Sequence, residues 1–259
     1  MDKISKSQVK MVRSLQQKKF RDELNFFVAE GDKCVSELMK GFELEMLVVN
    51  DPTVSFGVED KTVLATPVEI GQMSSLRTPQ GTIAVFRKRQ WPQEKINESM
   101  VNDQLVLALD GIQDPGNLGT IIRTCDWYGV HDIVCSLDTA DCYNPKVVQA
   151  TMGALSRVRV HYVNLSEWLS GQKDQQVNIF GTLLEGKNMY KVLPSESRSV
   201  IIMGNEGNGI SSAVRPFLTH PIRIPSFPEN ADTSESLNVS IATAIVLAEF
   251  RRPLFPIVR

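Results

Sequence analysis

The sequence lacks several features that would assign it to a common class. Its 259 residues include four cysteines, and none forms a Cys-x-x-Cys pair or lies near another Cys or His at metal-ligand spacing. The first residues lack the apolar core of a secretory signal, and the most apolar stretch, residues 237–248, is too short and interrupted to span a bilayer. We therefore expect a cytoplasmic protein with reduced, buried thiols, no metal centre and no membrane partner.

The residue patterns of common hydrolases and oxidoreductases are also missing. The histidines, His131, His161 and His220, belong to no Ser/His/Asp or Cys/His arrangement, and no pair of carboxylates stands out. Residues 204–209 read Gly-x-x-Gly-x-Gly, whereas a dinucleotide-binding loop reads Gly-x-Gly-x-x-Gly. A hydrolase and a conventional dehydrogenase are therefore disfavoured.

Charge is unevenly distributed along the chain. The formal net charge is −2, which by itself argues against a nucleic-acid partner. The first 21 residues nevertheless carry a basic group, and a second basic group follows near residue 90. The first group is Lys3, Lys6, Lys10, Arg13, Lys18, Lys19 and Arg21, and the second is Arg87, Lys88, Arg89 and Lys95. Local basic patches can contact phosphates, because salt confines each field to about 10 Å; the alternative is a solvated helix face.

The patterns divide the chain into a small α/β unit at 1–92, a linker at 93–102 and a larger α/β unit at 103–259. The linker combines proline and charges with few large apolar residues. In the small unit we expect helices at 4–20, 32–40 and after Pro67, and strands at 26–31, 44–50 and 81–87.

In the larger unit, apolar runs alternate with helical patterns, which indicates a mostly parallel sheet covered on both faces. We expect strands at 104–110, 132–136, 158–163, 177–183, 199–203 and 221–224. We expect helices at 117–129, 145–157, 165–170, 211–218 and 235–251. Ligands of such sheets bind beyond the carboxyl ends of the strands, so the polar loops there form the candidate site.

The first polar loop, residues 110–129, follows the first buried strand. Asn117 is a candidate N-cap for the next helix, and Arg123 lies six residues further on. A ligand that crosses the helix N-terminus could meet both side chains. The alternative is a structural role, in which Asn117 only caps the helix and Arg123 only pairs with Asp126.

The second polar loop, residues 201–211, contains three glycines, Gly204, Gly207 and Gly209, which allow the backbone to approach a ligand closely. Glu206 lies inside this loop and would repel a pyrophosphate. A cofactor with a positive centre, or a substrate with hydroxyl donors, suits this carboxylate better.

The third polar loop leads into the last helix. Thr233, Ser234 and Ser236 are candidate N-caps of that helix, and its apolar faces suggest burial in the domain or at a subunit interface. Ser236 and Asn238 would present a hydroxyl and an amide to the cleft. The alternative is that they only satisfy the helix end.

Together, the three loops resemble the SpoU/TrmH group of the SPOUT methyltransferases. Residues 117–123, NLGTIIR, look like the family motif N-x-G-x-x-x-R, and residues 203–211, MGNEGNGIS, are similar to M-G-x-E-x-x-G-[IL]-S. Residues 236–242, SLNVSIA, match S-L-N-V-S-x-A, and residues 150–154, ATMGA, resemble a fourth signature. The resemblance covers about 100–252. The N-terminal unit resembles, less specifically, the small ribosomal-protein-like domain with which many members bind substrate.

The resemblance implies an enzyme that methylates the ribose 2′-hydroxyl of RNA with S-adenosylmethionine, in a fold whose C-terminal segments form a trefoil knot. It implies a homodimer through the methyltransferase domain, with which the apolar last helix is consistent. Structured RNA is the expected partner, rRNA rather than tRNA, because shape-reading domains suit folded RNA. The residues that it implies for the cofactor are Gly204, Ile224 and Leu237, joined by Thr182, Leu183, Asn205 and Gly207.

The resemblance also implies a catalytic role for Arg123. An arginine is effectively always protonated, so a role as base requires help, for example from an RNA phosphate. The alternative is that Arg123 positions the phosphate and stabilises developing negative charge. Asn117, Glu206, Ser236 and Asn238 would orient Arg123 and the ribose. Two other functions stay open: a non-catalytic RNA-binding relative, and a knotted-fold base methyltransferase.

The sequence departs from the family pattern in one loop. Family members run from an Ile-Pro pair to Ser-Leu-Asn through a short loop that contains glycine. Here Ile224 and Pro225 are followed by SFPENADTSE, which is several residues longer and has no glycine. We therefore expect the geometry of this cofactor loop to differ from that of its relatives.

Overall fold

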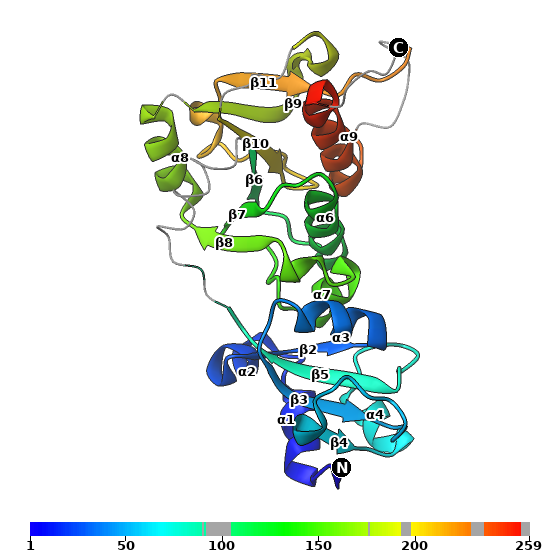
Figure 1. Cartoon of the computed structure of the whole chain (residues 1–259). Helices are drawn as coiled ribbons and strands as arrows, with labels where there is room; N and C mark the ends of the chain where they lie inside the picture. The colour runs from blue at the N-terminus through cyan, green and yellow to red at the C-terminus, as the bar shows by residue number, and fades with distance from the viewer. Residues whose placement is uncertain (90, 92–104, 176, 193–197, 229–235, 255–259) are drawn as a thin grey trace. The chain divides into compact units, whose positions relative to one another are not determined.

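The structure is a computed structural model that describes residues 1–89, 91, 105–175, 177–192, 198–228 and 236–254. Its contacts form two compact units (Figure 1). Unit 1 comprises Met1–Gln90 and Asp141–Arg157, and unit 2 comprises Trp91–Ala140 and Val158–Arg259. The sequence prediction assigned all residues from 103 onward to one domain, whereas contacts group 141–157 with the N-terminal unit. The predicted linker, 93–102, lies outside the described residues.

Unit 1 is built on a five-stranded mixed sheet of order β1-β4-β3-β5-β2. Its strands are β1 (Asp2–Lys3), β2 (Phe26–Glu30), β3 (Leu44–Val49), β4 (Thr62–Leu64) and β5 (Thr82–Arg87). Its helices are α1 (Lys6–Ser14), α2 (Lys18–Leu24), α3 (Asp32–Met39), α4 (Pro67–Met73) and α7 (Pro145–Thr151). The strands at 26–30, 44–49 and 82–87 confirm the predicted ones, whereas the short strands β1 and β4 were not predicted.

Successive side chains of β2 point to opposite faces of the sheet and pack into two cores of unit 1. Val28 packs with Val12 and Leu15 of the α1 segment and with Ile70 of α4. Phe27 points to the other face, where its ring lies 5.0 Å from that of Phe42 and 4.8 Å from that of Tyr143, centroid to centroid. The period of two along a strand therefore buries both faces of this sheet.

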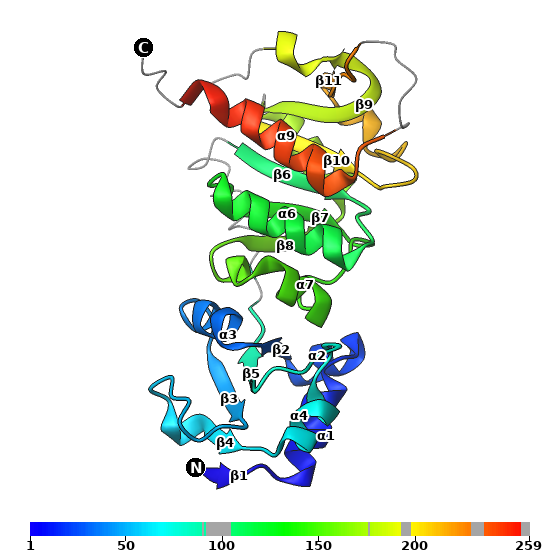
Figure 2. The same cartoon turned by 90° about the vertical axis from the view of Figure 1, so that its right-hand side faces the viewer.

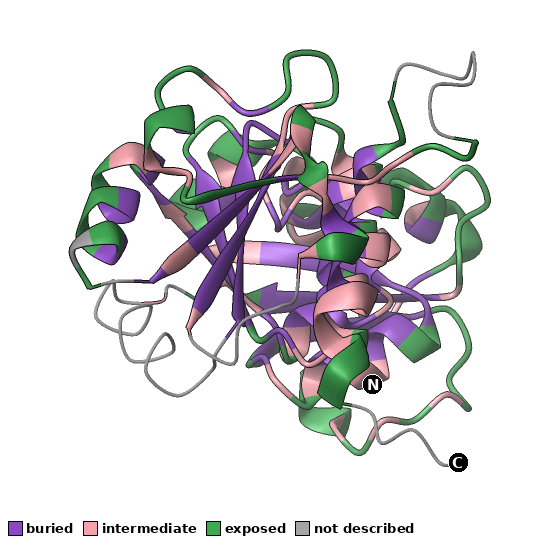
Figure 3. Ribbon diagram, turned by 90° about the horizontal axis from the view of Figure 1, so that it is seen from above, coloured by how far each residue is buried: buried purple, intermediate pink, exposed green. Residues whose placement is uncertain are grey.

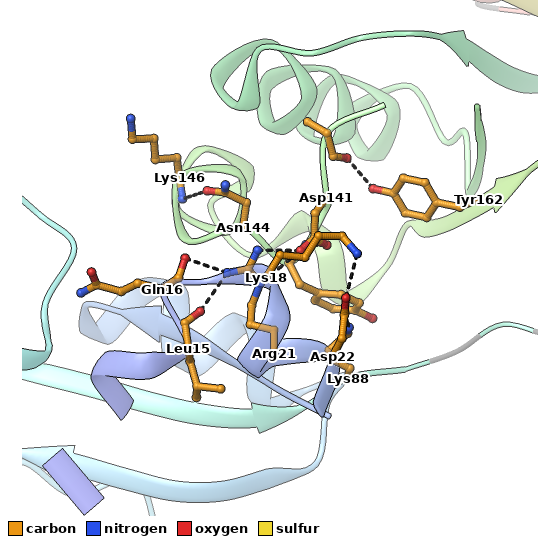
Figure 4. Close-up of polar contacts among 12 residues, drawn as sticks. Leu15, Gln16, Lys18, Arg21, Asp22, Lys88, Asp141, Asn144, Lys146 and Tyr162 are labelled. Atoms are coloured by element: carbon orange, nitrogen blue, oxygen red, sulfur yellow. Dashed lines mark hydrogen bonds and ion pairs between the residues drawn. The ribbon is translucent and has the colours of Figure 1, made fainter. Parts of the chain in front are cut away.

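A buried ion pair ties residues 141–157 into unit 1 (Figure 4). Arg21 is 1% exposed and donates from Nη2 and Nε to Asp141 Oδ2, at 2.7 and 3.1 Å. Its Nη1 donates to the carbonyl oxygens of Leu15 and Gln16 at 2.8 and 2.9 Å. All three guanidinium nitrogens are thus bonded, which a buried cation requires.

Two predicted helices are interrupted by local geometry. The prediction of one helix at 4–20 was wrong: α1 ends at Ser14 and α2 starts at Lys18, because the carbonyls of Leu15 and Gln16 accept hydrogen bonds from Arg21. The predicted helix at 145–157 ends at Thr151, since Met152 and Gly153 adopt left-handed φ angles of 51° and 91°. A short 3₁₀ turn at Ala154–Ser156 follows.

Unit 2 contains a six-stranded sheet of order β11-β9-β10-β6-β7-β8 in which all pairings are parallel. Its strands are β6 (Leu105–Asp110), β7 (Asp132–Ser136), β8 (Arg159–Val163), β9 (Asn178–Asn188), β10 (Ser199–Gly204) and β11 (His220–Arg223). Its helices are α6 (Pro115–Trp127), α8 (Leu165–Asp174) and α9 (Val239–Arg251). The prediction of a mostly parallel sheet is confirmed.

Helices cover both faces of the unit 2 sheet. Helices α6 and α9 run side by side on one face, and α8 lies on the other (Figures 1 and 2). The central strands β6 and β10 are buried over nearly their whole length, as their continuous apolar sequences predict. Figure 3 shows buried residues in purple along the strands. The predicted helix at 211–218 was wrong, since those residues contain only a 3₁₀ turn, Arg215–Phe217. No helix in the described ranges combines the length and apolarity that crossing a membrane requires.

We predict that Asp141→Ala lowers the free energy of unfolding by about 3 kcal/mol, because the Arg21 guanidinium would stay buried without its counter-ion. Asp22→Ala is the matched control: its carboxylate pairs with Lys18 and Lys88 but is 46% exposed, so we expect a loss below about 1 kcal/mol. Urea denaturation measures both values. Equal losses would contradict the assignment of Arg21–Asp141 as a buried clamp.

Candidate functional site

The first polar loop begins where β6 ends at Asp110. Gly111 has φ of +72°, its N–H donates to Ser136 Oγ at 2.8 Å, and its carbonyl accepts from Asn205 Nδ2 at 2.7 Å. Helix α6 then starts at Pro115 with Asp114 as N-cap, whose Oδ1 accepts the Asn117 N–H at 2.8 Å. The prediction of Asn117 as N-cap was therefore wrong. Because Asp114 caps the helix, the Asn117 side chain is available for other contacts.

Side chains from all three polar loops meet at Asn117. Its Nδ2 donates to Glu206 Oε1 at 2.9 Å, and its Oδ1 accepts from Asn238 Nδ2 at 3.0 Å. A carboxylate only accepts hydrogen bonds, so Glu206 fixes which end of the Asn117 amide faces it. The side-chain Oδ1 of Asn238 in turn accepts from the N–H and Oγ of Ser240. The result is a directed chain, Asn238 to Asn117 to Glu206, that ends on a carboxylate.

The glycine loop after β10 is folded tightly on itself. Asn205 and Gly209 exchange backbone hydrogen bonds of 3.0 and 2.9 Å. A Cβ at Gly204 would lie 2.3 Å from the carbonyl carbon of Gly209 and the nitrogen of Ile210, so only glycine fits there. The loop is tied to its neighbour strand, because Asp110 Oδ2 accepts the Ser211 N–H at 2.7 Å. This closure leaves Glu206 exposed at the tip.

Asn205, predicted to bind the cofactor, is used by the loop itself. Its Nδ2 bonds to the Gly111 carbonyl, and its Oδ1 accepts the N–H groups of Gly207 and Asn208 at 2.9 and 3.0 Å. Each polar atom of the amide therefore already has a protein partner. Within the structure, the Asn205 side chain holds two loops together.

Arg123 and Ser236 lie outside this hydrogen-bonded chain. Arg123 is exposed on α6, and no hydrogen bond or ion pair joins it to another described residue. Six residues of helix separate it from Asn117, a rise of about 9 Å. Ser236 is also exposed, and the N-cap of α9 is Asn238, so the prediction of Ser236 as cap was wrong. The other candidate caps, Thr233 and Ser234, lie outside the described residues.

The remaining residues predicted for the cofactor follow adjacent strands. Gly204 ends β10, Thr182 and Leu183 lie in β9 beside it, and Ile224 follows β11 on the other side of β9. Thr182 Oγ1 contacts the Ile202 carbonyl at 3.4 Å, and Leu183 packs partly on the core. The predicted cofactor residues Gly204, Thr182, Leu183 and Ile224 thus lie on or directly after three neighbouring strands of the parallel sheet.

Several features suit a ligand such as S-adenosylmethionine, which has an apolar adenosine face and a charged sulfonium. Leu237 is 48% exposed although it directly precedes Asn238 of the amide chain, so apolar surface adjoins polar groups. Glu206 supplies the negative charge that a sulfonium would favour. A cavity of about 590 Å³ includes in its lining Pro225, the residue that follows Ile224. Its full lining is Asn188, Tyr190, Lys191, Pro225, Ser226, Phe227 and Pro228. Of the longer loop at 226–235, residues 229–235 lie outside the described residues.

Buried polar residues that support the site were missed by sequence reasoning. Ser136 Oγ bonds to the Gly111 N–H and lies 3.0 Å from Thr139 Oγ1, and Ala140 N–H donates to the Ile112 carbonyl at 2.8 Å. The available signal was position alone: Asp110 and Ser136 end two apolar strands, where parallel sheets place their binding loops.

The cysteines are buried, as predicted, and offer no nucleophile. Burial raises the pKa of the Cys34 thiol to about 11, and burial also raises that of Cys125. His161 is buried as well, with Nε2 2.8 Å from Asp132 Oδ1. Among the described residues, no group of three or more His, Cys, Asp or Glu side chains is arranged to hold a metal ion.

The profile of the SpoU rRNA Methylase family matches residues 104–248, and that of the MRM3-like substrate binding domain matches residues 6–84. The chain is 31% identical over 247 residues to the 23S rRNA (guanosine(2553)-2′-O)-methyltransferase RlmP of Bacillus subtilis, with 94% of this chain and 95% of that protein covered.

Solved structures resemble the whole chain, and two of them are informative here. One is a protein from Porphyromonas gingivalis described as an RNA methyltransferase of the TrmH family, with a TM-score of 0.84, 34% identity and coverage of 96% and 99% of the two chains. The other is the AdoMet-bound rRNA methyltransferase of Sinorhizobium meliloti, with a TM-score of 0.84, 29% identity and coverage of 99% and 98%. Together with the profile match and the three loops, these findings show that the chain belongs to the SpoU/TrmH family of RNA methyltransferases.

Proposed function

We propose that this protein transfers the methyl group of S-adenosylmethionine to the ribose 2′-hydroxyl of a nucleotide in ribosomal RNA. The observation that carries the proposal is the directed chain Asn238–Asn117–Glu206, which joins the three family loops at one place. The names of the relatives support the substrate class, since RlmP of B. subtilis is a 23S rRNA 2′-O-methyltransferase.

The protein groups would act by positioning and by electrostatics. Bound S-adenosylmethionine supplies a methyl group on a sulfonium leaving group, which needs the attacking oxygen about 3 Å away and in line. Gly204, Ile224 and Leu237 would hold it with backbone and apolar surface. Glu206 would orient the Asn117 amide, which bonds to Glu206 and to Asn238. These contacts would fix the tip of the glycine loop relative to the start of α6.

Arg123 is suited to bind the RNA near the reacting ribose. Its guanidinium is exposed and has no partner among the described residues, so it is available for a phosphate. Because arginine stays protonated, we assign it to holding that phosphate and stabilising charge that develops on the 2′-oxygen. A role as base would require the Arg123 guanidinium to lose a proton first. A bound phosphate opposes this loss, because a nearby negative charge favours the positively charged form.

The assembly and topology of the protein form part of the same proposal. We propose a homodimer through α6 and α9, supported by the exposed apolar side chains Trp127 (84%) and Ile241 (53%) on these helices. We also propose the trefoil knot of the family in the C-terminal segments, and a cytoplasmic location. The described N-terminal unit would be the substrate-binding domain, as its matched profile suggests.

We predict that Arg123→Ala lowers kcat for rRNA methylation at least about 100-fold, because one charge-assisted contact made in the transition state is lost. Affinity for S-adenosylmethionine, measured by isothermal titration, should change less than about twofold. Arg123→Lys is the matched variant: it keeps the charge but loses the planar fork, so we expect partial activity. Full activity of Arg123→Ala would refute the assignment.

We predict that Glu206→Gln lowers kcat about 10- to 100-fold, because an amide can donate as well as accept and no longer fixes the orientation of Asn117. The unfolding midpoint should hardly change, since Glu206 is exposed. Glu185→Gln is the control: this carboxylate is exposed and pairs with Arg215 at 3.0 Å, away from the amide chain. If both variants retain wild-type turnover, the amide chain has no role in the reaction.

Product analysis tests the function itself. Purified protein, S-adenosylmethionine and unmodified rRNA transcripts should yield a methyl group on a ribose, located by mass spectrometry of digested RNA. A methyl group on a base would instead identify a base methyltransferase. RNA binding without cofactor binding would identify a non-catalytic relative.

A further inference from the structure

Helix α1 presents three cations on one side. Lys6, Lys10 and Arg13 are all exposed, and their spacing of four and three residues places them within about 60° of each other around the helix. Along the axis they span about 10 Å. We call Lys6, Lys10 and Arg13 the α1 basic stripe.

The stripe has no carboxylate partner in the structure. None of its three cations forms an ion pair with a described residue, whereas Lys18, Lys40 and Arg87 of the same unit do. Glu45 and Asp60 line a pocket beside α1, but they share it with Gln8 and Met11, which lie on the other side of the helix. The positive charge of the stripe is therefore not neutralised locally.

This arrangement does not stabilise the helix. Lys6 is the first residue of α1, and the first turn has no acidic residue, so a positive charge stands at the positive end of the helix dipole. Lys6 and Lys10 are like charges at i and i+4, which is also unfavourable. An external anion would relieve both repulsions. By contrast, Lys18 on α2 forms an i,i+4 pair with Asp22 at 2.8 Å.

The helix that carries the stripe is firmly held. Ser5 and Gln8 form a reciprocal capping box at its start, and Val12 is fully buried in the unit 1 core together with Leu15. The cations therefore stand on a fixed support, and binding would not have to order the backbone first.

We propose that the α1 basic stripe binds the phosphate backbone of the RNA substrate. It would hold folded RNA independently of sequence, because lysine and arginine side chains spaced along a helix meet successive phosphates but read no base edges. The proposal rests on the proposed function for the identity of the RNA. It assigns to α1 a contact that is separate from the three loops of the methyltransferase site.

The test compares two triple variants of the full-length protein. One is Lys6→Gln, Lys10→Gln and Arg13→Gln; the other is Lys18→Gln, Lys40→Gln and Arg87→Gln, which removes three cations of the same unit that already have carboxylate partners. Each lowers the formal net charge from −2 to −5. Glutamine keeps helix propensity close to that of lysine and arginine, and circular dichroism checks that both variants fold.

Binding to a 23S rRNA transcript is measured by filter binding from 50 to 300 mM KCl. Each phosphate contact contributes about 0.7 to 0.9 to the slope of log K against log salt. We expect the stripe variant to reduce the slope by about 2 to 3 and to raise KM without changing kcat at saturating RNA. The variant with paired cations should change the slope by less than about 1. Equal slopes for the two variants would overturn the proposal.

The outcome is independent of the proposed function. If wild-type protein methylates the transcript but the stripe variant keeps its salt slope, the inference about α1 fails alone. If wild-type protein transfers no methyl group while the stripe variant loses slope, α1 binds RNA and the proposed reaction fails. Binding of both variants with unchanged slopes to RNA, but loss of binding of the stripe variant to anionic lipid vesicles, would assign the stripe to a membrane surface and overturn the proposal.

Discussion

The candidate site depends on the end of one strand. At the carboxyl end of β6, Asp110 accepts the Ser211 N–H, and the next carbonyl, that of Gly111, accepts the Asn205 amide. These two bonds attach the glycine loop after β10 to the loop after β6. Without them Glu206 would have no fixed position relative to Asn117, and the amide chain that joins the three loops would not form. The polar carboxyl end of a buried, apolar strand thus organises the site.

The groups that hold the site and the groups that would act in it differ in burial. Asp110 and Ser136 are buried and hydrogen-bonded, so their removal would leave unpaired polar groups in the sheet. Glu206 and Arg123 are exposed and cap no helix, so their substitution costs little stability. Asn238 is exposed too, but it caps α9, so its substitution would lower the free energy of unfolding by about 1 kcal/mol. Activity and folding can therefore be separated by mutation here. A variant that loses turnover at an exposed position is informative, whereas one at a buried position is ambiguous.

Sequence patterns predicted the parts of the fold that local chemistry determines. The apolar run at 105–110 and its alternation with helices indicated the parallel sheet, and the carboxyl ends of its strands indicated where the loops meet. The family motifs selected Asn117, Glu206 and Asn238, whose side chains are joined by hydrogen bonds, and their role in catalysis stays a prediction. Their hydrogen bonds could not be predicted, because the residue that caps α6, Asp114, is also a common turn former and was interpreted only as part of a turn.

The failures arose where a distant residue decides local structure. The sequence near residue 15 contains no signal for the end of α1. The carbonyls of Leu15 and Gln16 accept hydrogen bonds from Arg21, and Arg21 in turn is held by Asp141, which is distant in the sequence. The same ion pair is one of several contacts that join residues 141–157 to unit 1, together with Arg157–Glu37 and the packing of Tyr143 on Phe27. Burying Arg21 also removes one cation of the basic N-terminus from any role in binding. Local charge composition therefore overstates the number of cations available to RNA, whereas the three cations of the α1 basic stripe are exposed and form no ion pair with a described residue.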